Sequence, residues 1–148
     1  MSEMFAGWPL LSIITFLPAA GAALILLSRA SLRGVDPGYD AGVRLLTLVI
    51  TAATFLVSLV AFAAFDPSQA GYQMIERHEW AFGIAYAMGV DALSVTLILL
   101  TTFLTPLCIL ASWSITKQVS SYMVLFLLLE TLMIGVFCAQ DIILFYLF

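Results

Sequence analysis

Polar residues divide the chain into apolar runs long enough to cross a membrane. Spanning about 30 Å of hydrocarbon takes about 20 consecutive apolar residues in a helix. The pattern therefore predicts an all-α integral membrane protein, a polytopic transmembrane helix bundle within a single domain, residues 1–148. The expected helices are residues 8–27, 45–65, 93–112 and 122–139, with the start of a fifth at 142–148.

The last of these runs is only seven residues long and ends at Phe148. Backbone groups at that depth of a bilayer have no water to bind. We therefore expect the sequence to be a fragment of a longer membrane protein.

The composition excludes a soluble domain. Hydrophobic residues make up 64% of the chain, charged residues only 9%, and the mean hydropathy is +1.14. A soluble protein is about 45–50% apolar and about 25% charged. Lipid is thus the expected surroundings, and the few Lys and Arg residues form no basic patch for nucleic acid. Cys108 and Cys138 lie inside apolar runs and offer no metal-ligand spacing.

The placement of the cations predicts the orientation in the membrane. Arg29, Arg33 and Arg44 follow the first apolar run, and Lys117 follows the third, so all four lie on one side. The positive-inside rule makes that side cytoplasmic. The N-terminus and the long acidic loop, residues 65–92, are then outside.

Within this outer loop, Ile84, Tyr86 and Met88 alternate with two alanines. Alternation with a period of two is typical of a strand. We expect a short strand or hairpin that covers the outer face of the bundle. Asp91 and Asp141 stand immediately before two of the expected helices, where an Asp side chain can cap the first turn.

Glu130 lies halfway along the fourth run, near the expected bilayer midplane. A carboxyl at that depth costs about 2.5–3.5 kcal/mol on insertion scales, so it calls for a role. One interpretation is a proton relay, in which the carboxyl takes up and releases a proton. The other is structural or coupling, in which the carboxyl joins two helices by hydrogen bonds.

Pro106 interrupts the hydrogen-bond ladder of the third expected helix, because it has no N–H to donate to the carbonyl of Thr102. Thr101, Thr102 and Thr105 cluster at the same level. The freed carbonyl and hydroxyls could hold water that conducts protons, or they could satisfy a packing kink, which we favour. No phosphate loop, catalytic triad or haem ligand set is present, so we expect no redox chemistry in this chain itself.

Three stretches in this order and spacing resemble one family. They are MGVDALS at 88–94, LETLMIGVF at 129–137 and DIILFYLF at 141–148, and LLTTFLTPLCILASW at 99–113 fits as well. Together they resemble the antiporter-like subunit M, also called chain 4, of respiratory complex I, the NADH-quinone oxidoreductase. The resemblance covers the whole chain and is most pronounced from residue 80 onward.

The resemblance implies a proton-translocating membrane-arm subunit with inverted repeats. Electron transfer in other subunits, which carry FMN, iron–sulfur clusters and the quinone site, would drive it, and this chain would bind no cofactor or metal. Its partners would be other membrane-arm subunits, especially the neighbouring antiporter-like ones, in a bacterial inner membrane.

Residue by residue, the resemblance implies little. Glu130 matches a glutamate common in bacterial members, and Asp91 matches the aspartate of the family's GVDGLS pattern. Ala92 stands where that pattern has glycine, a mild departure. The family's glutamate on the fifth helix and its central lysines would lie beyond Phe148.

Other functions remain open at this stage. A subunit of a multi-subunit cation/proton antiporter has a related sequence, and transport driven by an ion gradient without NADH would favour it. The sister complex I subunits L and N are also possible. An alternative of another class, a small membrane scaffold, leaves the cost of burying Glu130 without a purpose beyond helix contact.

Overall fold

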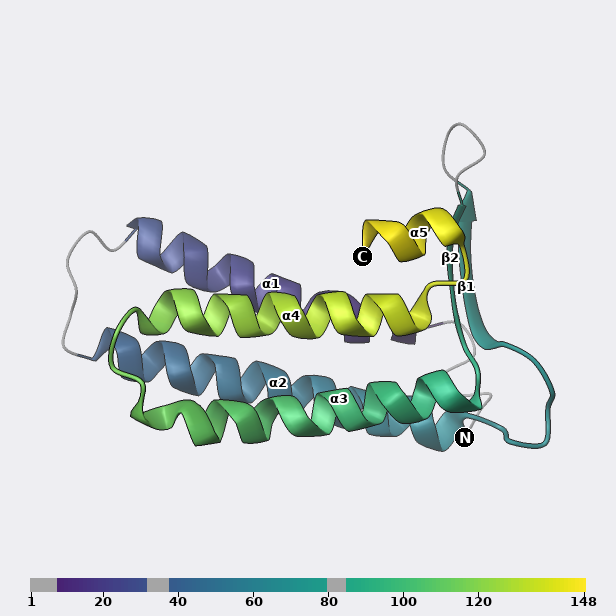
Figure 1. Cartoon of the computed structure of the whole chain (residues 1–148), viewed down its shortest axis with the longest axis horizontal. Coiled ribbons are helices and arrows are strands. Elements are labelled where there is room, and N and C mark those ends of the chain that lie inside the picture. Colours follow the sequence, from purple (N-terminus) through teal and green to yellow (C-terminus); the bar gives the residue numbers. More distant parts are fainter. Residues whose placement is uncertain (1–7, 32–37, 80–84) are drawn as a thin grey trace.

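The computed structural model describes residues 8–31, 38–79 and 85–148 of the chain. Four long helices lie side by side, and a hairpin stands across one end of them (Figure 1). The helices are α1 Leu10–Ser31, α2 Tyr39–Ala64, α3 Ala92–Ala111, α4 Val119–Cys138 and α5 Ile142–Leu147, and the short 3-10 turn η3, Ser112–Ser114, extends α3.

Each of the four long helices has the length and apolar composition to cross a membrane. Three of them, α1, α2 and α4, overrun the predicted apolar runs at the end opposite the hairpin. α1 continues to Ser31 rather than residue 27, and α2 begins at Tyr39 rather than residue 45. Hydropathy marks only the part of a helix that lies in hydrocarbon, whereas the backbone hydrogen bonds continue into the polar interface.

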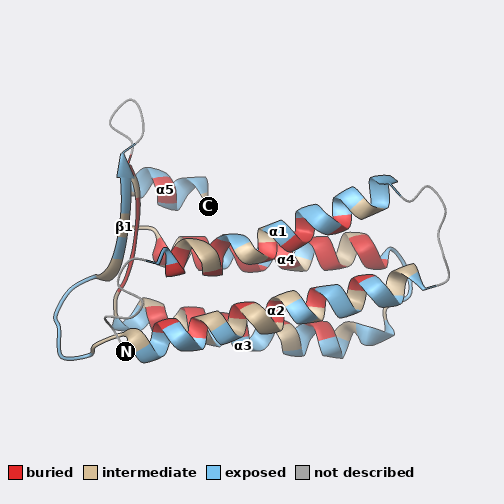
Figure 2. Cartoon of the chain, turned by 180° about the vertical axis from the view of Figure 1, so that it is seen from behind, coloured by how far each residue is buried: buried red, intermediate tan, exposed pale blue. Residues whose placement is uncertain are grey.

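Buried residues face the inside of the bundle, and exposed residues cover its outer surface (Figure 2). That outer surface is rich in large apolar side chains, including Leu56 on α2, Phe103 on α3 and Leu125 on α4. A soluble monomer rarely exposes so much apolar area. The arrangement fits surroundings of lipid or of other membrane helices, as the composition indicated.

The predicted hairpin is present. Strands β1 Gln73–Glu79 and β2 Ala85–Val90 pair antiparallel, with Glu79 opposite Ala85 and Glu76 opposite Met88. The first residue of the predicted alternation, Ile84, and the cation Arg33 lie outside the described residues.

The hairpin is attached to the turn between α4 and α5. Met88 of β2 forms an isolated bridge with Ala139, and the backbone N–H of Gln140 donates to the carbonyl of Ala87 at 3.0 Å. A Cβ added at Gly89 would meet the end of the Gln140 side chain, which would have to move to make room. The turn between α4 and α5 is thus joined to strand β2 by backbone contacts.

Two apolar cores fill the inside of the bundle, one near each end. The hairpin-end core contains Leu11, Ile14, Ala61, Met88, Val90, Val95, Ile98, Ile134, Cys138 and Leu144. The far-end core contains Ala22, Ile25, Val43, Ile109, Val119, Met123, Val124 and Leu127. On α2, α3 and α4, buried hydroxyl and carboxyl side chains occupy the sequence positions between the two cores.

Candidate functional site

These side chains form a central polar layer between the two apolar cores. Every member is buried, as polar groups at the depth of a membrane usually are, because they are costly to expose to lipid. The name covers seven side chains: Thr54 and Ser58 on α2, Thr101, Thr102 and Thr105 on α3, and Glu130 and Thr131 on α4. The buried hydroxyls of Thr47 and Thr51 on α2, and of Thr15 on α1, are not counted in it.

Glu130 lies on the buried face of α4, one turn from Leu127 on one side and from Ile134 on the other. That face packs against α1, α2 and α3, so the carboxyl points into the bundle rather than toward its surface. The residue is 2% exposed. Neither of its carboxyl oxygens has a hydrogen-bond partner among the described residues, and neither does the hydroxyl of Thr131.

The Thr105 side chain of α3 lies near the Glu130 carboxyl, across the interface between α3 and α4. The contact falls outside the geometry of a standard hydrogen bond. In the structure the Thr105 hydroxyl donates instead to the carbonyl of Thr101 on its own helix, at 2.9 Å. The hydroxyl oxygen keeps lone pairs for a second partner.

Ser58 of α2 and Thr102 of α3 join their helices by a hydroxyl contact of 2.6 Å in which either oxygen can donate. Each hydroxyl also reaches a carbonyl of its own helix, Ser58 that of Phe55 at 2.7 Å and Thr102 that of Ile98 at 3.0 Å. α3 continues through Pro106, which leaves the carbonyl of Thr102 without its helical partner. The sequence therefore identified Thr102 and Pro106 as neighbours in the fold, but not the partner Ser58.

The polar side chains of α2 were missed by sequence reasoning. Thr47, Thr51, Thr54 and Ser58 recur at spacings of three and four residues, which places them on one helical face. All four are buried, and each hydroxyl donates to a carbonyl three or four residues back. That spacing was the available signal, although it identifies a buried face and not the helix packed against it.

The two predicted capping residues lie away from the polar layer, at the hairpin end. Asp91 begins α3, and its carboxylate accepts from the backbone N–H of Ser94 at 2.7 Å. Hydrogen bonds from the Ser94 side chain and backbone hold the pKa of Asp91 below its usual value. Asp141 begins α5 and accepts from the backbone N–H of Ile143 at 2.8 Å.

The chemistry available to the polar layer is proton exchange. A carboxyl among hydroxyls can bind and release a proton, and hydroxyls both donate and accept hydrogen bonds. The described ranges contain no cluster of three His, Cys, Asp or Glu side chains that could hold a metal ion. The side chains around Glu130 therefore fit a site that binds and releases a proton.

Comparison with known proteins gives the family. Residues 43–139 match the family model described as NADH-ubiquinone oxidoreductase chain 4, amino terminus. The chain is 48% identical over 139 residues to NADH-quinone oxidoreductase subunit M of Rhodobacter capsulatus, an alignment covering 94% of this chain and 27% of that protein.

More distant relatives carry related names. The chain is 37% identical over 147 residues to NAD(P)H-quinone oxidoreductase chain 4 of Prochlorococcus marinus, covering 97% of this chain and 26% of that protein. It is 42% identical over 109 residues to NADH-ubiquinone oxidoreductase chain 4 of Arabidopsis thaliana, covering 72% of this chain and 22% of that protein. The chain thus spans about a quarter of the length of the curated relatives it matches.

The family match extends from the early part of α2 to the residue after α4, and so includes the whole central polar layer. The relatives' names agree with it and with the four apolar helices. The chain is a membrane protein that belongs to the family of NADH-quinone oxidoreductase chain 4, also named subunit M, and corresponds to its amino-terminal part.

Proposed function

We propose that this chain forms the N-terminal part of a subunit that moves protons across the membrane within NADH:quinone oxidoreductase. Electron transfer in other subunits supplies the energy, and Glu130 is a residue through which the proton passes. The family match and the names of the relatives support the enzyme complex. The buried carboxyl of Glu130 supports the proposal that the subunit moves protons.

The burial of Glu130 is the single observation that carries this proposal. Placing a carboxyl in a membrane interior is costly, and a structural role would offset the cost by hydrogen bonds. Within the described part of the chain, both oxygens of Glu130 lack such bonds. A carboxyl that exchanges a proton must keep an oxygen without a hydrogen-bond partner. A carboxyl that joins two helices would use that oxygen in a hydrogen bond to the second helix.

The surroundings of the subunit follow from the same proposal. Its partners are other membrane-arm subunits, especially the neighbouring antiporter-like ones, and the FMN, iron–sulfur clusters and quinone site belong to partner subunits. The membrane is the bacterial inner membrane, with the N-terminus outside. Arg29, Arg44 and Lys117 support this orientation, because they lie at the end opposite the hairpin.

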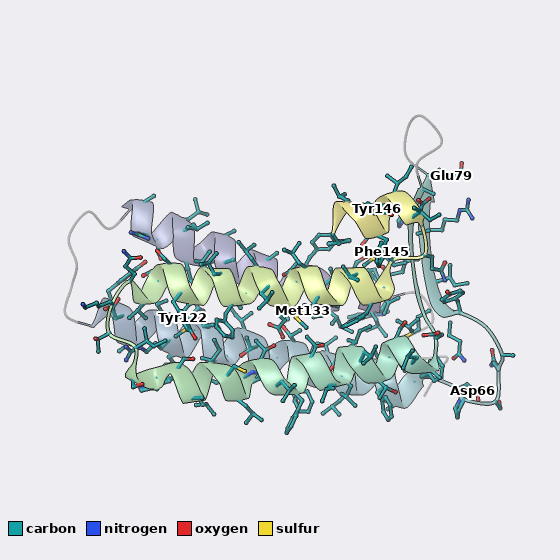
Figure 3. The ribbon with its side chains drawn as sticks, viewed as in Figure 1. Asp66, Glu79, Tyr122, Met133, Phe145 and Tyr146 are labelled. Atoms are coloured by element: carbon teal, nitrogen blue, oxygen red, sulfur yellow. The ribbon has the colours of Figure 1, made fainter. Side chains whose placement is uncertain are left out.

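The test replaces Glu130 by Gln in the full-length subunit within the assembled complex. Inverted membrane vesicles are energised with NADH, and proton uptake is measured together with NADH oxidation and the amount of assembled complex. Glu79→Gln is the matched control, because Glu79 is exposed at the end of β1, far from the layer (Figure 3). We expect Glu130→Gln to lower proton uptake per assembled complex, and Glu79→Gln to leave it unchanged.

Unchanged uptake in Glu130→Gln would remove Glu130 as an essential relay. Proton movement that follows an imposed cation gradient and ignores NADH would instead support a cation/proton antiporter.

A further inference from the structure

Thr105 lies beside Glu130, and its hydroxyl has the donor and acceptor capacity to respond when the carboxyl gains or loses a proton. A threonine hydroxyl has one proton to donate and two lone pairs to accept with. The Thr105 proton is directed to the carbonyl of Thr101, so the lone pairs remain open to a donor. Glu130 and Thr105 are both buried, at 2% and 8% exposed.

We propose that Thr105 is a positioning residue for Glu130, with a hydroxyl that reverses its hydrogen bond when the carboxyl gains or loses its proton. This inference rests on the proposed role of Glu130 as a proton relay. It adds a named partner on a second helix and a specific movement of one hydrogen atom.

The two states can be written with every proton accounted for. When Glu130 is protonated, its O–H donates to the Thr105 oxygen, and the Thr105 O–H donates to the Thr101 carbonyl. When Glu130 has released its proton, the Thr105 O–H rotates and donates to the carboxylate. The Thr101 carbonyl keeps its own helical bond in both states, so the rotation leaves α3 intact.

The rotated hydroxyl stabilises the carboxylate most where no charged group is available to do so. A hydrogen bond to a charged group is worth more than one between neutral groups. The cations of the described helices, Arg29 and Arg44, lie in the last turn of α1 and the second turn of α2, at the far end of the bundle. No ion pair therefore competes with the hydroxyl at the level of Glu130 among the described residues.

The polar path continues from Thr105 toward α2. Thr102 lies one turn away on the same face of α3. It forms a hydrogen bond with Ser58 in which either oxygen can donate. Two proton arrangements satisfy this pair equally. Either Thr102 donates to Ser58 while Ser58 donates to Phe55, or Ser58 donates to Thr102 while Thr102 donates to Ile98. A second reversible hydroxyl pair thus lies one helical turn from Thr105, at the interface between α2 and α3.

The experiment compares Thr105→Val, which keeps the shape and removes the hydroxyl, with Thr105→Ser, which keeps the hydroxyl. Both are made in the full-length subunit within the assembled complex. Thr47→Val is the matched control. Thr47 is buried as well, at 0% exposed against 8% for Thr105, and its hydroxyl donates to the carbonyl of Val43 at 2.8 Å. It lies about 16 Å along α2 from Ser58.

The first measurement is NADH-driven proton uptake per assembled complex. We expect a fall of about tenfold in Thr105→Val, the size of effect that loss of one hydrogen bond to a charged group can produce. Thr105→Ser should restore uptake, and Thr47→Val should leave it unchanged. Equal losses in Thr105→Val and Thr105→Ser, or no loss in either, would overturn the proposal.

The second measurement separates positioning from simple packing. The C=O stretching band of protonated Glu130 is assigned in infrared difference spectra by its disappearance in Glu130→Gln. It should move in Thr105→Val and not in Thr47→Val, and an unmoved band would overturn the proposal. If Glu130→Gln itself pumps normally, the relay role of Glu130 in the proposed function fails. If Glu130→Gln fails to pump while Thr105→Val pumps normally, only the role of Thr105 is wrong.

Discussion

The carboxylate of Glu76 accepts the backbone N–H of Leu11 at 2.8 Å, joining strand β1 to the first turn of α1 across 65 residues of sequence. It also accepts the backbone N–H of Ser12 at 3.2 Å and the Ser12 hydroxyl. The first four N–H groups of a helix lack partners within it, and a negative charge there is favourable. α1 has no acidic residue in its own first turn, so the hairpin supplies the cap.

Removing this cap should loosen the hairpin from the bundle. We expect Glu76→Ala to lower the free energy of unfolding of the intact subunit by about 0.5–2 kcal/mol, the usual cost of losing a helix cap. Amide hydrogen exchange at Leu11 and Ser12 should rise as well. Glu79→Ala is the control, because Glu79 is an exposed residue of the same strand. Equal exchange in the two variants would show that Glu76 does not hold the helix.

The cap of α3 should depend on pH. Hydrogen bonds from Ser94 lower the pKa of Asp91, so ionised Asp91 is bound more favourably in the folded state. Its contribution is complete above the unfolded pKa of about 3.9 and is lost as the pH falls through the lower folded value. Asp91→Asn keeps a good cap without the charge. The stability difference between the wild-type subunit and Asp91→Asn should therefore shrink on acidification below about pH 4.

Unfolding curves of both proteins in detergent, recorded across that pH range, measure this difference. A difference that is constant with pH would mean that the charge of Asp91 contributes nothing. Asp91→Ala should cost about 0.5–2 kcal/mol at neutral pH, because it removes the acceptor altogether.

Gly21 sets the spacing of three helices. A Cβ added at Gly21 of α1 would lie 2.5 Å from Cδ1 and 3.2 Å from Cγ2 of Ile50 on α2, and 3.4 Å from Cδ1 of Leu127 on α4. We expect Gly21→Leu to destabilise the subunit by about 1–3 kcal/mol through overpacking. Gly42 is the control, since an added Cβ there meets nothing within 4 Å. Gly42→Ala should be neutral or stabilising, because alanine favours a helix; thermal unfolding in detergent compares the two.

The contact between Ser58 and Thr102 should appear as a coupling between two substitutions. Ser58→Ala and Thr102→Val each remove one hydroxyl of a buried pair. In a double-mutant cycle on unfolding free energies, we expect an interaction of about 0.6 kcal/mol, the average for hydrogen bonds between membrane helices. The pair Thr47→Val and Thr102→Val should give additive changes, because those hydroxyls bond only to their own helices or to Ser58. Additivity in both cycles would contradict the contact.

Several elements could be predicted because their causes are local. The hairpin followed from the alternation in residues 84–88, which a pleated strand places on two faces. The caps at Asp91 and Asp141 followed from an aspartate directly before an apolar run. The strand β1 and its bulge near Met74 had no such pattern, because Gln73–Glu79 is mostly polar and pairs through its backbone.

The candidate site was predicted only in part. Glu130 and the threonines near Pro106 stood out because a polar residue in an apolar run is conspicuous in sequence. Ser58 and Thr54 did not, because isolated hydroxyls are common in membrane helices and bond to their own backbone. Which hydroxyl side chains lie near Glu130 depends on the rotation and register of α2 and α3 against α4.

The sequence by itself thus determined the membrane class, the number of long helices and the single acidic residue at their centre. Those properties depend on apolar length and on one residue's position along a helix. Only the tertiary structure decided that Thr105 lies near Glu130 and that Glu76 caps α1. Both contacts join segments far apart in the chain, and their geometry comes from how helices pack, which no local pattern of residues encodes.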